Sequence, residues 1–167
     1  MSEHQPTAAP AVEAAVPAPP TVEATAPATP EPGPLPALGA TAGFRKTVTE
    51  ADVVLFAGIT GDFAPLHVDA DYMSRHPLGE RVAHGILTLG IASTAASALC
   101  AQERLVAVSA GYDRLRFLRP VLLGDTVDCR YEVVAVDENR RRAHAQVEVR
   151  NQRGEMCLAA THLLHCY

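Results

Sequence analysis

Apolar and polar residues alternate with a period of two along much of the second half of this chain. The alternation is clearest over residues 127–133 and 143–150, where apolar positions are separated by charged or polar ones. Strands that bury one face and expose the other produce this period. Other extended segments are expected at residues 44–48, 105–109, 112–118 and 156–166. The pattern predicts four or five antiparallel strands in this half, preceded by one short strand.

The longest predicted helix is a run without Asp, Glu, Lys or Arg, residues 84–101. It is shorter than the roughly 20 residues of a membrane span, and it contains four hydroxyl side chains, so we expect it in a protein core. Shorter helices, capped by Thr49 and Asp69, are expected at residues 50–57 and 70–75. One sheet must then curl around one long apolar helix, which is an α+β architecture.

Residues 1–40 differ in composition from the rest of the chain. They hold ten of the 13 prolines and contain no Lys, Arg or aromatic residue. Such a segment buries too little apolar area to offset the entropy of ordering it. We therefore expect a disordered Pro/Ala-rich tail at residues 1–40 and a single domain at residues 41–167. The prolines and Glu13 would interrupt the apolar core of a signal peptide, so we expect a cytoplasmic protein.

The distribution of charge indicates which partners to expect, and the spacing of the cysteines indicates whether disulfides form. All 14 basic residues lie after residue 40, beside 15 of the 19 acidic ones, and they form no basic stripe. We therefore expect neither a nucleic-acid nor a membrane partner. Because the cysteines show no CxxC spacing, we expect buried free thiols rather than disulfides. The cysteines are Cys100, Cys129, Cys157 and Cys166.

The residues most able to do chemistry lie in the loop after the first helix. Asp62 and His67 are five residues apart in a segment bent by Gly61 and Pro65. A carboxylate and an imidazole at this spacing can hold one water and exchange protons with it. The first N–H groups of the helix at residues 84–101 lack intrahelical partners and attract negative charge. The hypothesis requires that all these groups face one pocket.

The same residue types could also belong to a metal site or to a hydrolase. The acidic and histidine residues near Asp62 match no metal-ligand spacing, so we expect no metal and no cofactor. A serine hydrolase would need a nucleophile elbow, which the sequence lacks. His162 and His165 are an odd number of residues apart on a predicted strand, so they face opposite sides. Arg116 and its neighbouring arginines are either phosphate ligands or solvated strand charges.

Three segments of the chain follow one another in an order found in a known family. They are residues 61–69 (GDFAPLHVD), residues 82–87 (VAHGIL) and residues 117–121 (FLRPV), the last followed by Gly124-Asp125. Together they resemble the MaoC-like dehydratases, and within these the (R)-specific enoyl-CoA hydratases. The resemblance covers roughly residues 44–165.

The resemblance implies a hot-dog fold, with the sheet wrapped around the helix at residues 84–101. It also implies a homodimer or a dimer of dimers, with sheets joined edge to edge and active sites near the interface. Asp62 and His67 match the catalytic pair of the family, and Gly85 matches its oxyanion-hole donor. Further substrate-binding positions are expected at Ala64, Pro65, His84, Ser93 and Arg116. Ala64 replaces the asparagine that the family usually has.

The expected reaction is the reversible addition of water to a trans-2-enoyl-CoA, giving an (R)-3-hydroxyacyl-CoA. The substrate is an acyl thioester of CoA or of an acyl carrier. Two alternatives stay open at this point. One keeps the fold but hydrolyses the thioester, and the other is a non-catalytic subunit that binds acyl thioesters.

Overall fold

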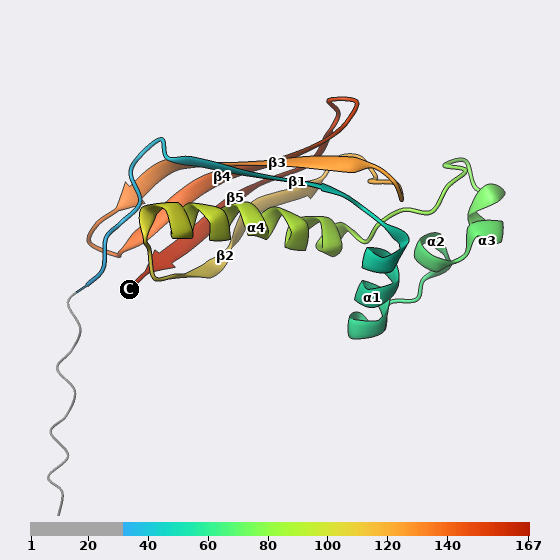
Figure 1. Cartoon of the computed structure of the whole chain (residues 1–167), viewed down its shortest axis with the longest axis horizontal. Coiled ribbons are helices and arrows are strands. Elements are labelled where there is room, and N and C mark those ends of the chain that lie inside the picture. The colour runs from blue at the N-terminus through green and yellow to red at the C-terminus, as the bar shows by residue number, and fades with distance from the viewer. Residues whose placement is uncertain (1–31) are drawn as a thin grey trace, which may run out of the picture. The chain divides into compact units, whose positions relative to one another are not determined.

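Five antiparallel strands form one sheet in the part of the chain that the computed structural model describes, residues 32–167 (Figure 1). The strand order is β1-β3-β4-β5-β2, and every neighbouring pair is antiparallel. The strands are β1 Thr41–Thr47, β2 Ala107–Phe117, β3 Thr126–Asp137, β4 Arg142–Asn151 and β5 Met156–Cys166. The antiparallel sheet predicted from the period-two pattern is therefore confirmed.

One edge strand departs from the predicted pattern. Residues 105–109 and 112–118 were expected as separate segments, but a single strand, β2, covers most of both. It pairs with β5 through two irregularities, between Ser109 and Gly111 and between Asp113 and Arg116. Each irregularity inserts unpaired residues, which bends an edge strand and increases its twist. The local break in alternation therefore reflects bulges within one strand.

The long helix, α4 (Gly85–Glu103), lies along one face of the sheet (Figure 1). It packs against β1, β3 and β4, so the sheet wraps around a central helix as the hot-dog fold requires. Its small residues permit close contact with the strands, because short side chains let the backbones approach. The buried side chains of α4 are Thr88, Ile91, Ala92, Ala95, Ala96 and Leu99.

The opposite side of α4 is exposed, although the sequence predicted a helix buried all round. The sheet covers only one side, and an uncharged stripe faces away from it. Among residues 32–167, α4 is the one helix that is long and apolar enough to cross a bilayer by length and composition. A helix that packs on a sheet in a protein core also needs apolar residues, so the packing of α4 explains its composition equally well. The stripe consists of Ile86, Gly90, Ser93, Thr94 and Ser97.

Three shorter helices lie at the end of the sheet where α4 begins (Figure 1). α1 (Glu50–Thr60) has the predicted Thr49 cap, which forms a reciprocal capping box with Asp52. It runs one turn further than predicted, because Gly58 stays helical and a left-handed Gly61 ends the helix instead. α2 (Pro65–Val68) and α3 (Ala70–Ser74) follow, and Asp69 caps α3 as expected.

The packed chain begins earlier than the predicted domain boundary at residue 41. Compact structure starts at Pro32, and the Gly33 N–H donates to the Tyr167 carbonyl at 2.9 Å. The Arg141 guanidinium donates to the carbonyls of both residues. Leu35 then packs on the core, so residues 32–40 belong to the domain. The rest of the expected tail, residues 1–31, lies outside the described residues.

The four cysteines are free, as predicted. Cys129, Cys157 and Cys166 are buried, and Cys100 on α4 is partly buried. Burial raises the pKa of each thiol, which keeps it protonated and unreactive at neutral pH. These residues therefore act as small apolar side chains.

A row of hydrogen-bonded polar side chains runs across the sheet from β3 through β5 to the edge strand β2. His162 on β5 is buried, and its Nδ1 lies 2.8 Å from the Tyr131 hydroxyl. Its Nε2 lies 2.8 Å from the Ser109 hydroxyl on the edge strand. The ring also stacks on Tyr112, with centroids 4.4 Å apart. Both ring nitrogens are thus satisfied while the imidazole is neutral.

Burial lowers the pKa of His162 to about 4. In the unfolded chain this imidazole has its ordinary pKa near 6.5. The contribution of neutral His162 to stability is therefore complete above pH 6.5 and is lost as the pH falls towards 4. We expect this one group to lower the free energy of unfolding by about 3 kcal/mol over that range.

The measurement is urea unfolding at several pH values between 7 and 4 for wild type and His162→Phe. The variant is less stable at pH 7, because the Tyr131 hydroxyl loses its partner, but its stability falls less steeply with acid. The control is His76→Gln, which removes an exposed loop histidine and leaves the slope unchanged. Equal slopes in wild type and His162→Phe would contradict this assignment.

Candidate active site

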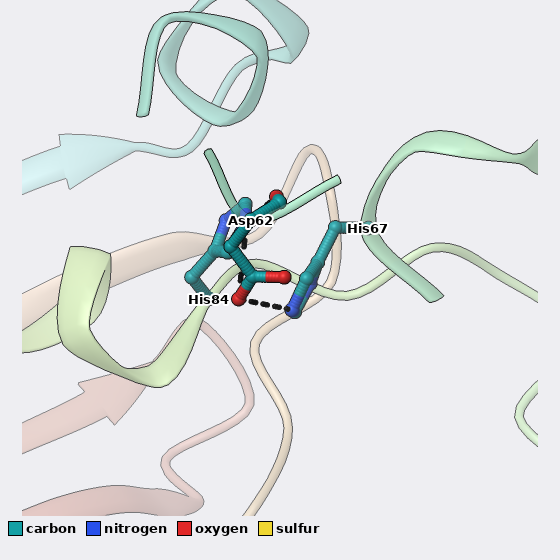
Figure 2. A group of neighbouring side chains, drawn as sticks. All are labelled: Asp62, His67 and His84. Atoms are coloured by element: carbon teal, nitrogen blue, oxygen red, sulfur yellow. Dashed lines mark hydrogen bonds and ion pairs between the residues drawn. The ribbon is translucent and has the colours of Figure 1, made fainter. Parts of the chain in front are cut away.

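Asp62, His67 and His84 converge at the start of α4 (Figure 2). The Oδ2 atom of Asp62 lies 3.9 Å from Nε2 of His67 and 4.0 Å from Nε2 of His84. The carboxylate is about half exposed, whereas both imidazoles are buried. The two groups predicted to act together, Asp62 and His67, therefore do lie side by side, with the carboxylate open to solvent.

Hydrogen bonding determines which nitrogen of His67 carries its proton. Nδ1 lies 2.7 Å from the Val82 carbonyl oxygen, which can only accept. Nδ1 must therefore be protonated, and in the neutral ring Nε2 keeps a lone pair directed towards Asp62. The Val82 N–H in turn donates to the Leu66 carbonyl at 3.1 Å, so two backbone segments hold this imidazole.

His84 contacts the other two residues rather than a substrate cavity. Its ring stacks on His67 with centroids 3.6 Å apart, and Phe56 of α1 packs against it at 4.9 Å. Its Nε2 lies 3.0 Å from the Asp62 carbonyl oxygen, so that nitrogen carries the hydrogen. Its Nδ1 is buried without a partner among the described residues. His84 thus holds the loop that presents Asp62 and His67.

A cavity of about 330 Å³ opens beside this cluster. His67 and Gly85 line it, whereas Asp62 lies at its side, within 3.9 Å of His67. The walls are mostly apolar, as expected for an acyl group. The remaining lining residues are Leu66, Val82, Ala83, Thr88, Phe117, Leu118, Arg119, Pro120 and Val121.

Gly85 is the first residue of α4 and allows Phe117 to approach the helix closely. A Cβ at this position would lie 3.0 to 3.1 Å from three atoms of the Phe117 ring. The preceding residue, His84, makes no side-chain cap to the helix. The first N–H groups of α4 therefore keep no intrahelical acceptor, and at Gly85 they border the cavity. A developing negative charge in the cavity would be stabilised there.

The three converging side chains also offer possible metal ligands within 4.8 Å of one another. His84 donates its Nε2 hydrogen to a carbonyl, so this nitrogen has no lone pair for a metal. Two ligands remain, Asp62 and His67, fewer than the three that catalytic zinc sites use. The arrangement does not fit a metal, and the expected lack of a metal stays a prediction.

The other predicted site residues are not among those that line the cavity. Pro65 is the first residue of α2 and Ala64 is its N-cap residue, and the Ala64 N–H donates to Oδ1 of Asp62 at 3.2 Å. Ser93 lies on the exposed stripe of α4 and donates to the Gly90 carbonyl. Arg116 is exposed on β2 and donates to its neighbour's carbonyl. In this single chain, none of these four residues lines the cavity.

Several lining residues had no predicted role. Phe117 and Val121 belong to the third family segment and had no expected function, whereas Arg119 in the same segment was expected only as a phosphate ligand or a solvated charge. The third family segment comes at the end of a strand that runs back towards the start of α4. This position in the sequence could have indicated that its residues lie near the site. Thr88 could have been found from its helical spacing, since it lies one turn after Gly85. Arg119, rather than Arg116, is the arginine beside the cavity.

Comparison with known proteins shows to which family the chain is similar. The chain is 37% identical to the 3-hydroxybutyryl-CoA dehydratase of Methylorubrum extorquens over 106 residues, which is 64% of this chain and 66% of that protein. It is 38% identical to the (R)-specific enoyl-CoA hydratase of Rhodospirillum rubrum over 91 residues, 53% of this chain and 60% of that protein. The matches therefore span slightly less than two thirds of these relatives.

A solved structure gives the same picture of the fold. The unliganded R-hydratase of Pseudomonas aeruginosa superposes with a TM-score of 0.68 at 30% identity, covering 78% of this chain and 81% of that one. The family model described as the MaoC like domain matches residues 36–155, which is most of the chain. The matched range includes the whole of α4 and the loop that carries Asp62 and His67. The chain is a member of the MaoC-like domain family.

Proposed function

We propose that this protein adds water reversibly to a trans-2-enoyl-CoA and forms an (R)-3-hydroxyacyl-CoA. The observation that carries the proposal is the fixed tautomer of His67, whose unprotonated Nε2 lies 3.9 Å from the Asp62 carboxylate beside an apolar cavity. The similarity to proteins named as hydratases and dehydratases supports the same class of reaction. Neither a metal nor a cofactor enters the proposed reaction.

The gap between Asp62 and His67 suits a bound water. A separation of 3.9 Å is too long for a direct hydrogen bond, but one water can bridge the two groups. As the oxygen of that water bonds to C3 of the substrate, one group of the pair takes its proton. The π electrons of the C2–C3 bond shift towards the thioester, and the pair then delivers that same proton to C2, so that Asp62 and His67 both return to their starting state. The atoms of one water are thereby added across the double bond.

The thioester oxygen gains negative charge during this step. The first N–H groups of α4, beginning with that of Gly85, can donate to it, and the helix dipole has the same favourable sign. Apolar side chains such as Phe117 line the cavity, and an acyl group packed against them would displace water and strengthen these interactions. A substrate whose carbonyl points at Gly85 would present C3 towards His67.

Two substitutions test the catalytic pair. We expect Asp62→Asn and His67→Gln each to lower the rate of crotonyl-CoA hydration by at least about a hundredfold, because each removes a group that transfers a proton. The assay follows loss of the enoyl absorbance, with circular dichroism to confirm folding. Full activity in either folded variant would refute the mechanism.

The same samples distinguish the two other functions. A thioesterase would release free CoA thiol from an acyl-CoA, which a thiol reagent detects. It would not add water to the C2–C3 double bond. A non-catalytic binding subunit would bind crotonyl-CoA without either change. Hydration by wild type without thiol release is the result we expect.

The space around Gly85 gives a second test. We expect Gly85→Ala to lower kcat/KM about tenfold or more, because the added Cβ would push the Phe117 ring or the helix start by several tenths of an ångström. Adding Phe117→Leu should recover part of the loss by removing the clashing ring. The control is Gly58→Ala in α1, where a Cβ would meet nothing within 4 Å. A fully active Gly85→Ala enzyme would show that this close contact is not needed.

We also propose that the protein acts as a homodimer, which would be the basic unit of any larger assembly. The exposed stripe of α4 is uncharged, and the outer edge of β2 has no strand partner within residues 32–167. A second copy could cover both surfaces and thereby bring Ser93 and Arg116 closer to an active site. The predicted cytoplasmic location stays a prediction.

A charge placed in the stripe should disrupt such a dimer. We expect Ser97→Arg to shift the protein from dimer to monomer in sedimentation experiments, because an unpaired buried charge is costly at a helix–helix contact. Asn139→Arg, in the exposed turn between β3 and β4, is the matched control and should stay dimeric. A monomeric wild type, or a dimeric Ser97→Arg variant, would contradict this assembly.

A further inference from the structure

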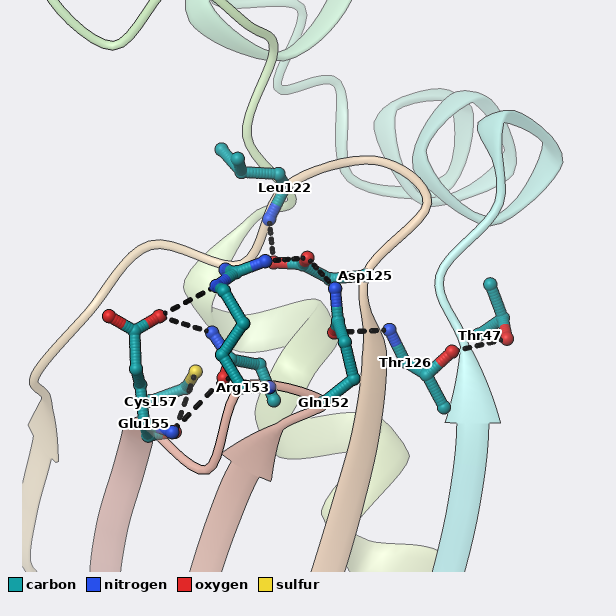
Figure 3. A network of polar contacts seen from close by, with 9 residues as sticks. Thr47, Leu122, Asp125, Thr126, Gln152, Arg153, Glu155 and Cys157 are labelled. Carbon is teal, nitrogen blue, oxygen red and sulfur yellow. Dashed lines mark hydrogen bonds and ion pairs between the residues drawn. The ribbon is translucent and has the colours of Figure 1, made fainter.

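A buried carboxylate, Asp125, lies at the centre of the polar network drawn in Figure 3. Its side chain accepts four hydrogen bonds. Oδ1 accepts from Gln152 at 2.6 Å and from Arg153 at 2.8 Å, and Oδ2 accepts from the Leu122 N–H at 3.0 Å and from Arg153 at 3.2 Å. Asp125 is 4% exposed, so it belongs to the interior of the domain.

The surroundings of Asp125 favour its charged form. Burial by itself would raise the pKa of the carboxyl group, but the hydrogen bonds from Arg153, the Leu122 N–H and Gln152 hold the pKa below its usual value. Arg153 is itself held in place by Glu155, whose carboxylate is 2.9 Å from Nε. The carboxylate is thus a fixed, negatively charged anchor at neutral pH.

The anchor closes the loop that forms one wall of the cavity. The Asp125 N–H donates to the Leu122 carbonyl while its side chain accepts from the Leu122 N–H, so the two residues are tied twice. Gly124 supplies the positive φ of 91° that this tight turn needs. The Gly124 N–H and the Asp125 carbonyl pair with Val48, just before α1. Residues 120 and 121, directly before the turn, line the cavity.

The loop in turn holds the segment that orients His67. Leu122 and Val82 form an isolated β-bridge, and the Ala83 N–H donates to the Val121 carbonyl at 2.8 Å. Val82 is the residue whose carbonyl accepts the Nδ1 hydrogen of His67. A continuous path of hydrogen bonds and one bridge therefore runs from Asp125 through Leu122 and Val82 to the imidazole.

We propose that Asp125 is a positioning residue for His67: by anchoring the turn at Leu122, it places the Val82 carbonyl that keeps the His67 proton on Nδ1. The consequence for catalysis rests on the proposed hydratase function, but the consequence for the tautomer does not. Without the anchor, the Val82 carbonyl can move away and the imidazole can protonate on Nε2 instead. The lone pair needed beside Asp62 is then lost in part of the molecules.

The test is Asp125→Asn, which keeps the size of the side chain but removes its charge and one acceptor oxygen. Imidazole ¹⁵N spectra of wild type at a pH where the histidines are neutral should show His67 only as the Nδ1–H form, with its signal assigned by its absence in His67→Gln. In Asp125→Asn we expect a clear population of the Nε2–H form. In crotonyl-CoA hydration we expect kcat to fall about ten- to a hundredfold while KM changes by less than about threefold.

A matched control separates positioning from general damage. Asp128→Asn, three residues later on β3, changes an exposed carboxylate paired with Arg45 at 3.6 Å, and should alter neither the tautomer nor kcat. Arg153→Lys keeps the positive charge but loses the two-pronged contact, so it should give an intermediate effect and serves if Asp125→Asn does not fold. An unchanged His67 tautomer in a folded Asp125→Asn or Arg153→Lys variant would overturn the proposal, whether or not the enzyme hydrates crotonyl-CoA.

Discussion

The hydrogen bond from Nδ1 of His67 to the Val82 carbonyl is the interaction on which the site depends. It determines where the proton lies on a buried imidazole and therefore which nitrogen can accept another. Val82 is able to hold the ring because its own N–H is bound to Leu66 and its segment is bridged to Leu122. The backbone at Val82 is thus held in place, and it orients the His67 side chain.

A second constraint is that α4 serves the core and the site at the same time. Its buried face needs small side chains because the sheet lies close against it, and its first turn needs Gly85 because the Phe117 ring lies there. The direction of the helix places its N-terminus at the end of the sheet where α1, α2 and α3 gather (Figure 1). The loop that carries Asp62 and His67 and the positive end of the helix dipole therefore meet at the same end of the domain.

Much of this arrangement was predictable from residue patterns. The period of two over residues 127–133 and 143–150 requires half-buried strands, whatever their neighbours are. The uncharged run after His84 predicted a helix packed against the sheet, which is correct for one side of α4, whereas the expected burial of its other side is not seen in the single chain. The spacing of Asp62 and His67 indicated a pair that could share one water, and the family segments indicated the hot-dog fold. These predictions depend on patterns among residues that are close together in the sequence.

Contacts between distant segments could not be predicted in this way. The alternation of residues does not show whether Arg116 or Arg119 borders the cavity, because Arg116 follows an irregularity in β2 and Arg119 lies beyond the end of that strand. The stacking of His84 on His67 joins residues 17 positions apart, and the path from Asp125 to Val82 joins residues 43 positions apart. Such contacts depend on how strands, turns and helix are placed in three dimensions. Patterns of neighbouring residues specify the elements, whereas the proton position on His67 follows from the packing of segments that meet only after folding.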